Sequence, residues 1–253
     1  MANKSISALS TQPSRPRAST SQKGKNSTAS LLKIIDVEQG SQSWFEARLG
    51  IPSASRFGTV MANGKDGGES ITRLEYLRRL AGEIITGRLA EETFKSSAME
   101  RGKEMEPEAI ADYEERRGVT VQRVGLGINF SGLKRCCASP DGIVGFDGGL
   151  ETKTMRPDKM IPLLEKGAGM LPEHRAQVQG NILVFERDWW DFKIFYPKMP
   201  PFEVRVTRDD RYIRELHDQI ERFNHDLKTL VERLRKMGAA YDIAEAMLKE
   251  SER

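Results

Sequence analysis

The spacing of apolar positions predicts long amphipathic helices in three parts of the chain. Apolar residues recur every three or four positions over 70–86, 96–117 and 213–237, the period at which side chains share one face of an α-helix. Ser70 can cap the first of these helices, and Gly87 ends it. The apolar seam over 213–237 is expected to pack on the domain itself, with a partner-facing coiled coil as the alternative.

Apolar runs between these helices predict β-strands. A meander of four strands follows the second helix, and Asp147-Gly148-Gly149 marks a tight turn between its last two members. A helix that begins near Pro172, two more strands and the long last helix come next. These elements span 119–130, 134–139, 143–146, 150–155, 172–185, 190–196 and 202–206. Their order predicts an α/β fold with a mixed β-sheet flanked by helices and a long C-terminal helix.

Two short helices are predicted near the start of the fold, which is expected to begin near Leu32. Ser43 and Glu46 have capping-box spacing around the first of these helices. After a break at Gly50, Ser53 can cap the second.

The composition of its ends divides the chain into an arm, one domain and a tail. Residues 1–31 are rich in Ser, Thr, Lys, Arg and Pro and hold almost no large apolar residue, so we expect a disordered basic arm. The arm lacks the amphipathic apolar face of a transit peptide. Residues 32–237 are long enough for one well-buried domain, and 238–253 are expected to form a short tail.

The charges are distributed unevenly along the chain. The net charge is +3, from 40 basic and 37 acidic residues. The first 33 residues hold six of the basic side chains and no acid, so the remainder of the chain is slightly acidic. Any nucleic acid is therefore expected to bind through a local basic groove and not through the net charge.

Several classes of protein are excluded by what the sequence lacks. No apolar run approaches the ~20 residues that cross a bilayer, and no signal-peptide core is visible, so we expect a cytoplasmic protein without membrane contact. The two cysteines, Cys136 and Cys137, are adjacent and cannot supply the four thiolates of an iron–sulfur cluster. They are expected to be partly buried residues of a strand that form no disulfide.

The clearest chemical pattern surrounds the predicted hairpin. Asp141 lies ten residues before Glu151, and the turn between their strands allows the two carboxylates to converge. Glu151 and Lys153 are two apart on one strand and therefore share a face. Two carboxylates hold a hard divalent cation, and an adjacent lysine can serve a metal-bound water and stabilise charge on a phosphate. This set suits phosphodiester hydrolysis, and a surface hairpin with a Glu–Lys pair is the structural alternative.

Glu106 lies in the middle of the apolar face predicted over 96–117. A carboxylate in that position needs a partner, because desolvating an unpaired charge is costly. The spacing leaves two interpretations open, a buried salt bridge and a carboxylate that faces an active site or a metal.

Five stretches of the sequence carry a resemblance to a known family. They are WFEARLG at 44–50, SAS at 53–55, RGKEME at 101–106, SPDG at 139–142 with ETK at 151–153, and AQVQ at 176–179. In this order they resemble the lambda-exonuclease family of viral recombination nucleases, also called the YqaJ-like family, within the PD-(D/E)XK nuclease superfamily. The resemblance covers roughly residues 38–215 and implies a restriction-endonuclease-like core.

The resemblance implies a metal site on the predicted hairpin. Asp141, Glu151, the Thr152 carbonyl and Glu106 would be ligands of Mg²⁺, with Mn²⁺ as a substitute. Lys153 would serve the attacking water. The match of Glu106 to the family's helical glutamate favours the functional interpretation of this residue.

The resemblance also implies which residues surround this metal site. Gln177 would hold the lysine or the water, and His174, one helical turn before it, is a further residue expected to line the site. Arg48 and Ser55 match residues that receive the 5′-phosphate of a DNA end. Ser131 departs from the family, whose prototype carries an aspartate there, so a second metal is in question.

The resemblance also implies an activity and its partners. The chain would be a Mg²⁺-dependent exonuclease that degrades one strand of linear double-stranded DNA from 5′ to 3′ and leaves 3′ single strands for phage-type recombination. A ring-shaped homotrimer, DNA ends, a single-strand annealing protein and, if phage-encoded, the host cytoplasm are implied with it. The alternatives are a structure- or site-specific endonuclease of the same superfamily and a non-catalytic DNA-end-binding module.

Overall fold

The computed structural model describes residues 31–89, 97–130, 135–167 and 169–238. The predicted basic arm up to Ser30 and the predicted tail from Ala239 lie outside these ranges. The described part is an α/β fold with two sheets, which confirms the predicted class. A five-stranded mixed sheet has the order β2 (Val121–Gln122), β5 (Gly142–Val144), β6 (Gly148–Thr154), β7 (Trp189–Phe195) and β8 (Phe202–Thr207). A three-stranded sheet has the order β1 (Leu32–Ile35), β3 (Leu126–Asn129) and β4 (Cys136–Ala138).

The predicted hairpin is present, but its turn lies earlier than expected. The turn consists of residues 145–147, with Gly145 at a φ of +57°, and β6 already begins at Gly148. Gly148 and Gly149 serve packing instead, because a Cβ on them would lie 2.0 Å from the Trp189 ring and 2.3 Å from the Trp190 ring. The two glycines thus allow the rings of β7 to lie directly against β6.

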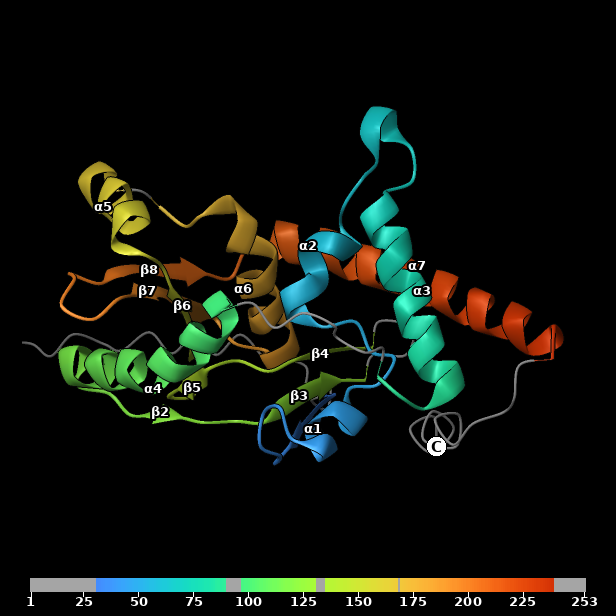
Figure 1. The fold of residues 1–253 in the computed structure, drawn as a ribbon, viewed down its shortest axis with the longest axis horizontal. Coiled ribbons are helices and arrows are strands. Elements are labelled where there is room, and N and C mark those ends of the chain that lie inside the picture. The colour runs from blue at the N-terminus through green and yellow to red at the C-terminus, as the bar shows by residue number, and fades with distance from the viewer. Residues whose placement is uncertain (1–30, 90–96, 131–134, 168, 239–253) are drawn as a thin grey trace, which may run out of the picture. The chain divides into compact units, whose positions relative to one another are not determined.

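Strand β7 is buried on both faces, although its sequence alternates between apolar and charged residues. Helix α4 (Ser97–Arg117) covers one face, and α6 (Pro172–Phe185) packs on the other (Figure 1). On the α4 side, Asp191 accepts a 2.7 Å hydrogen bond from the Tyr113 hydroxyl and pairs with Arg205. Lys193, which is fully buried, pairs with Asp112. These partners satisfy the two buried charges, which would be costly to desolvate alone.

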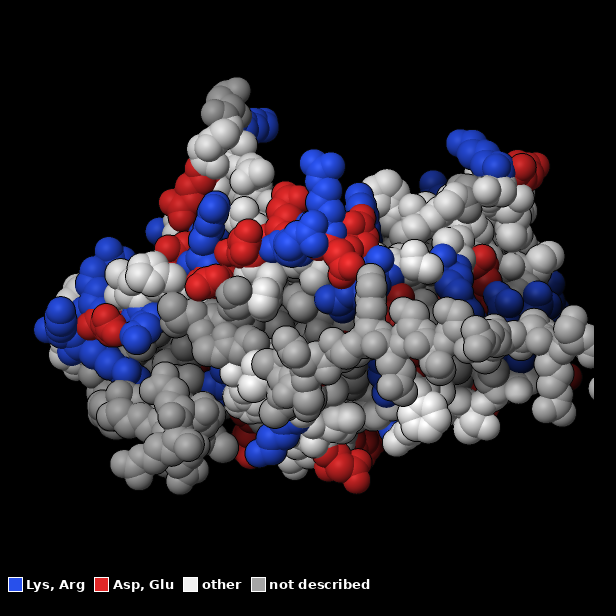
Figure 2. All heavy atoms as spheres, turned by 180° about the vertical axis from the view of Figure 1, so that it is seen from behind, with Lys and Arg blue, Asp and Glu red and all other residues white. Residues whose placement is uncertain are grey.

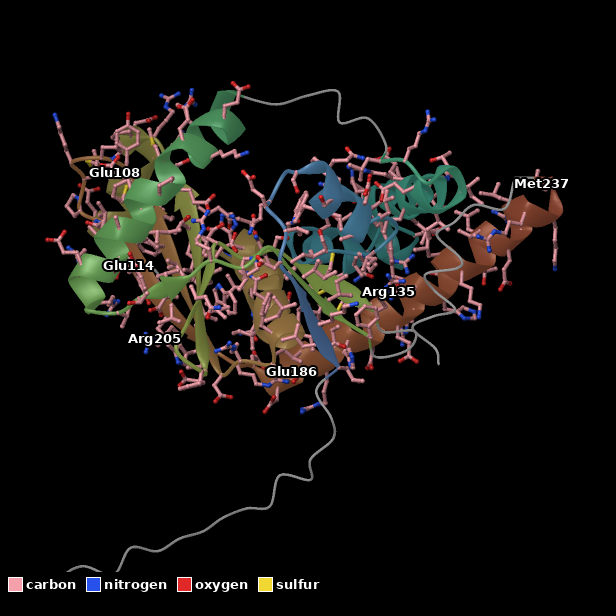
Figure 3. All side chains as sticks on the ribbon, turned by 90° about the horizontal axis from the view of Figure 1, so that it is seen from below. Glu108, Glu114, Arg135, Glu186, Arg205 and Met237 are labelled. Carbon is pink, nitrogen blue, oxygen red and sulfur yellow. The ribbon has the colours of Figure 1, made fainter. Side chains whose placement is uncertain are left out.

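The long last helix packs on the domain, as the first of the two interpretations predicted. Helix α7 (Asp210–Lys236) is capped by Asp209 and buries Ile213, Leu216, Ile220, Phe223, Leu227 and Val231. It contacts α3 (Ile71–Thr86), whose predicted Ser70 cap and left-handed Gly87 are both present. Met237, the last residue of the predicted seam, is 77% exposed at the end of α7 (Figure 3).

The short elements near the start differ in detail from the prediction. Helix α1 (Gln42–Ala47) is capped by Ser41, whose hydroxyl accepts from the Trp44 amide, so Ser43 lies inside the helix and is not its cap. Ser53 does precede the 3₁₀ helix η1 (Ala54–Arg56), but its side chain makes no capping bond. The short α2 (Phe57–Val60) and the 3₁₀ helix η2 (Lys65–Gly67) complete this region.

Strand β1 and helix α5 (Pro157–Lys166) were not predicted from the sequence, and the single strand predicted over 119–130 is two strands, β2 and β3, in different sheets. Strand β1 pairs with β3, and α5 has Pro157 in its first turn and Pro162 inside it.

The cysteines form β4 together with Ala138 and are free of disulfides, as predicted, and both are fully buried. On the face drawn in Figure 2, basic and acidic side chains are interspersed over the described residues, in line with the nearly balanced charge.

Candidate active site

The β5–β6 hairpin brings Asp141 beside the strand that carries Glu151 and Lys153. Gly142 pairs with Leu150 at the end of the hairpin that is away from its turn. Asp141, directly before β5, therefore lies at the same end as Glu151 of β6. Asp141 Oδ2 accepts hydrogen bonds from the main-chain N–H of Thr152 at 2.5 Å and from its hydroxyl at 2.7 Å. The predicted convergence on one hairpin is therefore present in the structure.

The Glu151 carboxylate is buried, with 2% of the residue exposed, and both of its oxygens accept hydrogen bonds. Oε1 accepts from Lys153 Nζ on the same strand and from Gln177 Nε2 at 2.5 Å. Oε2 accepts from Asn181 Nδ2 at 2.9 Å. Two of the three donors lie on α6, which reaches Glu151 because β6 and β7 are parallel neighbours and α6 belongs to the crossover between them.

The local electrostatics perturb both members of the Glu151–Lys153 pair. Burial raises the pKa of Glu151 to about 7, against the opposing charge of Lys153 and together with the charge of Asp141. Burial by itself would lower the pKa of Lys153, but the charges of Glu151 and Asp141 raise it above its usual value. Perturbed groups of this kind cluster at functional sites.

Glu106 has the partner of the structural interpretation and also lies close to the hairpin acids. Its Oε1 is 2.6 Å from Arg123 Nη2 in an ion pair. Burial and then the charge of Asp141 raise the pKa of Glu106, while Arg123 and Lys153 lower it. The two interpretations are thus compatible, since Glu106 is paired and still within electrostatic reach of Asp141.

The donor set fits a hard divalent cation. The acids Asp141 and Glu151 repel each other through space, and such a repulsion is relieved by a cation with oxygen ligands. Within the ranges that the structure describes, no three or more His, Cys, Asp or Glu side chains form a metal-holding group. Among these residues, Glu106 is therefore not brought together with Asp141 and Glu151 as a third acidic ligand. The two carboxylates and the Thr152 carbonyl, a main-chain oxygen, remain a consistent set.

Helix α6 presents a polar stripe to this site. His174, Gln177 and Asn181 are spaced three and four apart, which places them on one helical face. The His174 ring lies against Phe192, with 4.9 Å between centroids. Burial and then the charge of Lys153 lower the pKa of His174, so the neutral imidazole is favoured. Sequence reasoning missed Asn181, although its i+4 spacing from Gln177 is a signal for it.

The predicted phosphate-binding residues line a pocket of about 210 Å³. The Arg48 guanidinium lies over the Trp44 ring at 4.4 Å and donates to Ser53 Oγ at 3.3 Å, and Ser53 Oγ is 3.0 Å from Ser55 Oγ. Ser139, which accepts a 2.7 Å hydrogen bond from the Trp44 indole, also lines it. Gln177 and Asn181 of α6 are also among the lining residues. Arg48 and Ser55 thus share one pocket with the amides that hold Glu151.

The turn after α1 positions Arg48. Gly50 has a φ of +65°, a left-handed conformation that glycine adopts without strain. Its N–H donates to Glu83 Oε2 at 3.1 Å. Glu83 is a buried residue of α3 that also pairs with Arg79. Arg48 is therefore held at the end of α1 by the core and not by a free loop.

This fold and the hairpin set Asp141, Glu151 and Lys153 define a member of the PD-(D/E)XK superfamily. Residues 43–188 match the model of the YqaJ-like viral recombinase domain. The chain belongs to this family, as its resemblance to lambda exonuclease predicted. Ser131, the position at which the sequence departs from the family, lies outside the described residues.

Three solved structures of two proteins are similar to this chain. The alkaline exonuclease LHK-Exo from Laribacter hongkongensis is 32% identical, with a TM-score of 0.69 over 79% of this chain and 98% of that one. Its complex with dAMP gives a TM-score of 0.70 at the same identity and coverage. A phage-related exonuclease from Haemophilus somnus 129PT, 15% identical with a TM-score of 0.55 over 73% and 96% of the two chains, shares the fold. No curated protein matches the chain.

Proposed function

We propose that this protein is a metal-dependent exonuclease that degrades one strand of linear double-stranded DNA from 5′ to 3′. Its family and its likeness to an alkaline exonuclease support nuclease activity. The observation that carries the proposal is the shared pocket. Arg48 and Ser55 lie in it together with Gln177, which donates a hydrogen bond to the Glu151 carboxylate. A terminal phosphate bound there would lie beside the hairpin acids.

The hairpin would supply the catalytic chemistry. Asp141, Glu151 and the Thr152 carbonyl would hold Mg²⁺, or Mn²⁺ in its place, with Glu106 as the further acid of the site. When bound, the ion offsets phosphate charge and lowers the pKa of a coordinated water. Lys153, kept cationic by its two acidic neighbours, would orient the attacking water and stabilise the charge that develops on the phosphate.

Helix α6 would hold these groups in place. Gln177 would fix Glu151 and, through the shared oxygen Oε1, the ammonium of Lys153. His174 would line the site as a neutral ring against Phe192. Neither residue needs to exchange a proton for this role.

The direction of digestion would follow from the pocket. The planar fork of arginine binds phosphate through two parallel hydrogen bonds, and Arg48 would offer it together with the Ser55 hydroxyl. A 5′-phosphate anchored there would direct the first phosphodiester toward the hairpin and leave the 3′ strand intact. The structural alternative, an arginine and serine that only support each other, is compatible with the Arg48–Ser53–Ser55 chain of contacts.

The biological role would be the preparation of DNA ends for recombination. The family resemblance supports a ring-shaped homotrimer around DNA, a single-strand annealing protein as partner and, for a phage-encoded protein, the host cytoplasm. Among the described residues, no helix is both long and apolar enough to span a bilayer.

Digestion of linear, nicked and closed circular duplexes with Mg²⁺ tests the proposal. An exonuclease is expected to release mononucleotides from the linear duplex and to spare the closed circle. Cleavage of closed circular DNA would favour the endonuclease alternative. If none of the three DNA substrates is degraded in Mg²⁺ or Mn²⁺, the non-catalytic end-binding module is favoured.

A further inference from the structure

The two oxygens of Glu151 differ in how they are held. Oε1 has two donors, Lys153 and Gln177, whereas the donor to Oε2 is Asn181, at 2.9 Å. The terminal torsion of a glutamate side chain is broad and has only a twofold preference. Donors on one oxygen restrain this torsion at that oxygen alone, whereas a donor on each oxygen holds the carboxylate plane from both sides.

Asn181 is suited to fix that plane because it cannot itself move away. It is 1% exposed, and its neighbour Gly180 lies so close to α2 that a Cβ there would be 2.4 Å from the Phe57 ring. This close approach anchors α6 against η1 and α2. The position of the Asn181 backbone is therefore determined by core packing and not by the charges of the site.

The amide is also the appropriate group for a buried carboxylate. A buried carboxylate oxygen without a donor loses its solvation and gains no hydrogen bond in return, which is costly for a charged group. The NH₂ of asparagine supplies the hydrogen bond without adding a charge that would compete with a cation. Gln177 supplies the same chemistry one helical turn earlier.

We propose that Asn181 is a positioning residue that fixes the Glu151 carboxylate in the orientation required to bind a divalent cation. With Gln177 it forms a two-amide clamp, defined as the pair of α6 side chains that donate to opposite oxygens of Glu151. The clamp rests on the proposed function, since it assigns Asn181 a part in the same metal site. Residues that orient a metal ligand typically contribute 10- to 100-fold in metal affinity or activity.

The chain offers a matched control for this proposal on the same helix. Gln179 is a buried amide, 2% exposed, that donates to the Thr207 carbonyl at 2.9 Å and accepts from the Asp209 N–H at 3.0 Å. It makes these contacts on the side of α6 away from Glu151. Asn181→Leu and Gln179→Leu thus each replace a buried amide of α6 by an apolar side chain, and only the first removes a donor to Glu151.

The decisive measurement is the affinity for Mn²⁺ by calorimetry in the absence of DNA. Asn181→Leu is expected to weaken Mn²⁺ binding by at least ~10-fold, whereas Gln179→Leu is expected to keep the wild-type affinity and lose only thermal stability. In cleavage assays, Asn181→Leu is expected to need correspondingly more Mn²⁺ for half-maximal rate. Asn181→Ala, which leaves space in place of the amide, serves if the leucine variant does not fold.

The possible outcomes separate the clamp from the proposed function. If wild type binds Mn²⁺ and digests linear duplex, but Asn181→Leu and Asn181→Ala bind Mn²⁺ as wild type does, the positioning role is wrong and the nuclease stands. An equal loss of affinity in Asn181→Leu and Gln179→Leu would also reject the role, because it would report a general effect on α6. If wild type neither binds Mn²⁺ nor cleaves DNA, both proposals are rejected.

Discussion

Gln177 donates a 2.5 Å hydrogen bond to Glu151 across 26 residues of sequence. The contact joins the helix α6 to the strand β6, and the same glutamate oxygen accepts from Lys153. It therefore links the two halves of the proposed active site, the hairpin that carries the acids and the helix that carries the amides. Substitutions in either half are expected to affect the chemistry.

Asp141→Ala, Glu151→Ala and Lys153→Ala are each expected to reduce nuclease activity by at least ~100-fold, the scale of losing a group that stabilises charge in a transition state. Binding of a DNA end is expected to survive, because the pocket around Arg48 does not depend on these side chains. Single-turnover digestion of linear duplex and a separate binding measurement check this. Near-wild-type cleavage by a folded Lys153→Ala protein would show that Lys153 has no part in the mechanism.

A 5′-phosphorylated duplex is expected to be digested faster than a 5′-hydroxyl duplex. The reason is the pocket, where Arg48 and Ser55 offer a guanidinium and a hydroxyl to a terminal phosphate. Arg48→Ala is expected to erase most of the difference while hydrolysis persists, and Arg48→Lys is expected to restore little of it, because lysine lacks the bidentate fork. Rates on both ends with the three proteins measure this. Equal rates on the two ends for wild type would exclude the phosphate pocket.

Deletion of residues 1–30 is expected to lower the salt dependence of DNA binding and to leave the rate of hydrolysis unchanged. The segment carries basic residues and no acid, and each basic side chain that meets a phosphate adds roughly 0.9 to the slope of log K against log salt. Binding titrations at several salt concentrations compare the two proteins. An unchanged slope would indicate that the arm has a function other than contact with DNA.

Cys136 and Cys137 are expected to resist thiol reagents at pH 8 in the folded protein and to react rapidly in denaturant. Burial raises the pKa of the Cys137 thiol to about 11 and that of Cys136 still further above its usual value. The reactive thiolate is therefore scarce until the protein unfolds, when the pKa returns to about 8.5. Because only the unfolded state ionises above that pH, these two groups are expected to reduce stability as the pH rises through 9. Fast labelling of the native protein would contradict the burial of β4.

The hairpin that carries the acids and the bounds of α3 could be predicted because they depend on local spacing, whereas the family was recognised from the resemblance of five stretches. Asp141, Glu151 and Lys153 follow from strand alternation and one turn, and Ser70 and Gly87 mark their helix by capping chemistry alone. The burial of Asp191 and Lys193 could not be predicted in this way. It depends on Tyr113, Arg205 and Asp112, which reach β7 only through the tertiary fold.

Proline and glycine misled the prediction for a similar reason. Pro157 and Pro162 conceal α5, since one of them lies inside the helix and is a poor helix former there. Gly148 and Gly149 suggested a turn, whereas they leave room for two tryptophan rings of a strand about 40 residues away. The sequence shows which backbone conformations a glycine or proline allows. The side chain that packs against it is known only from the tertiary fold.

The parallel pairing of β6 with β7 has a consequence for the order in which the protein folds. The acids lie on a hairpin of adjacent strands, which closes a short loop, but Leu150 pairs with Asp191 across the whole crossover that contains α5 and α6. Closing this long segment costs more chain entropy and is correspondingly slower. The acidic pair is thus expected to assemble early and its amide supports late. A growing chain that has not yet completed β7 would carry the acids of the proposed site before α6 is held against them, so this site is expected to be complete only late in folding.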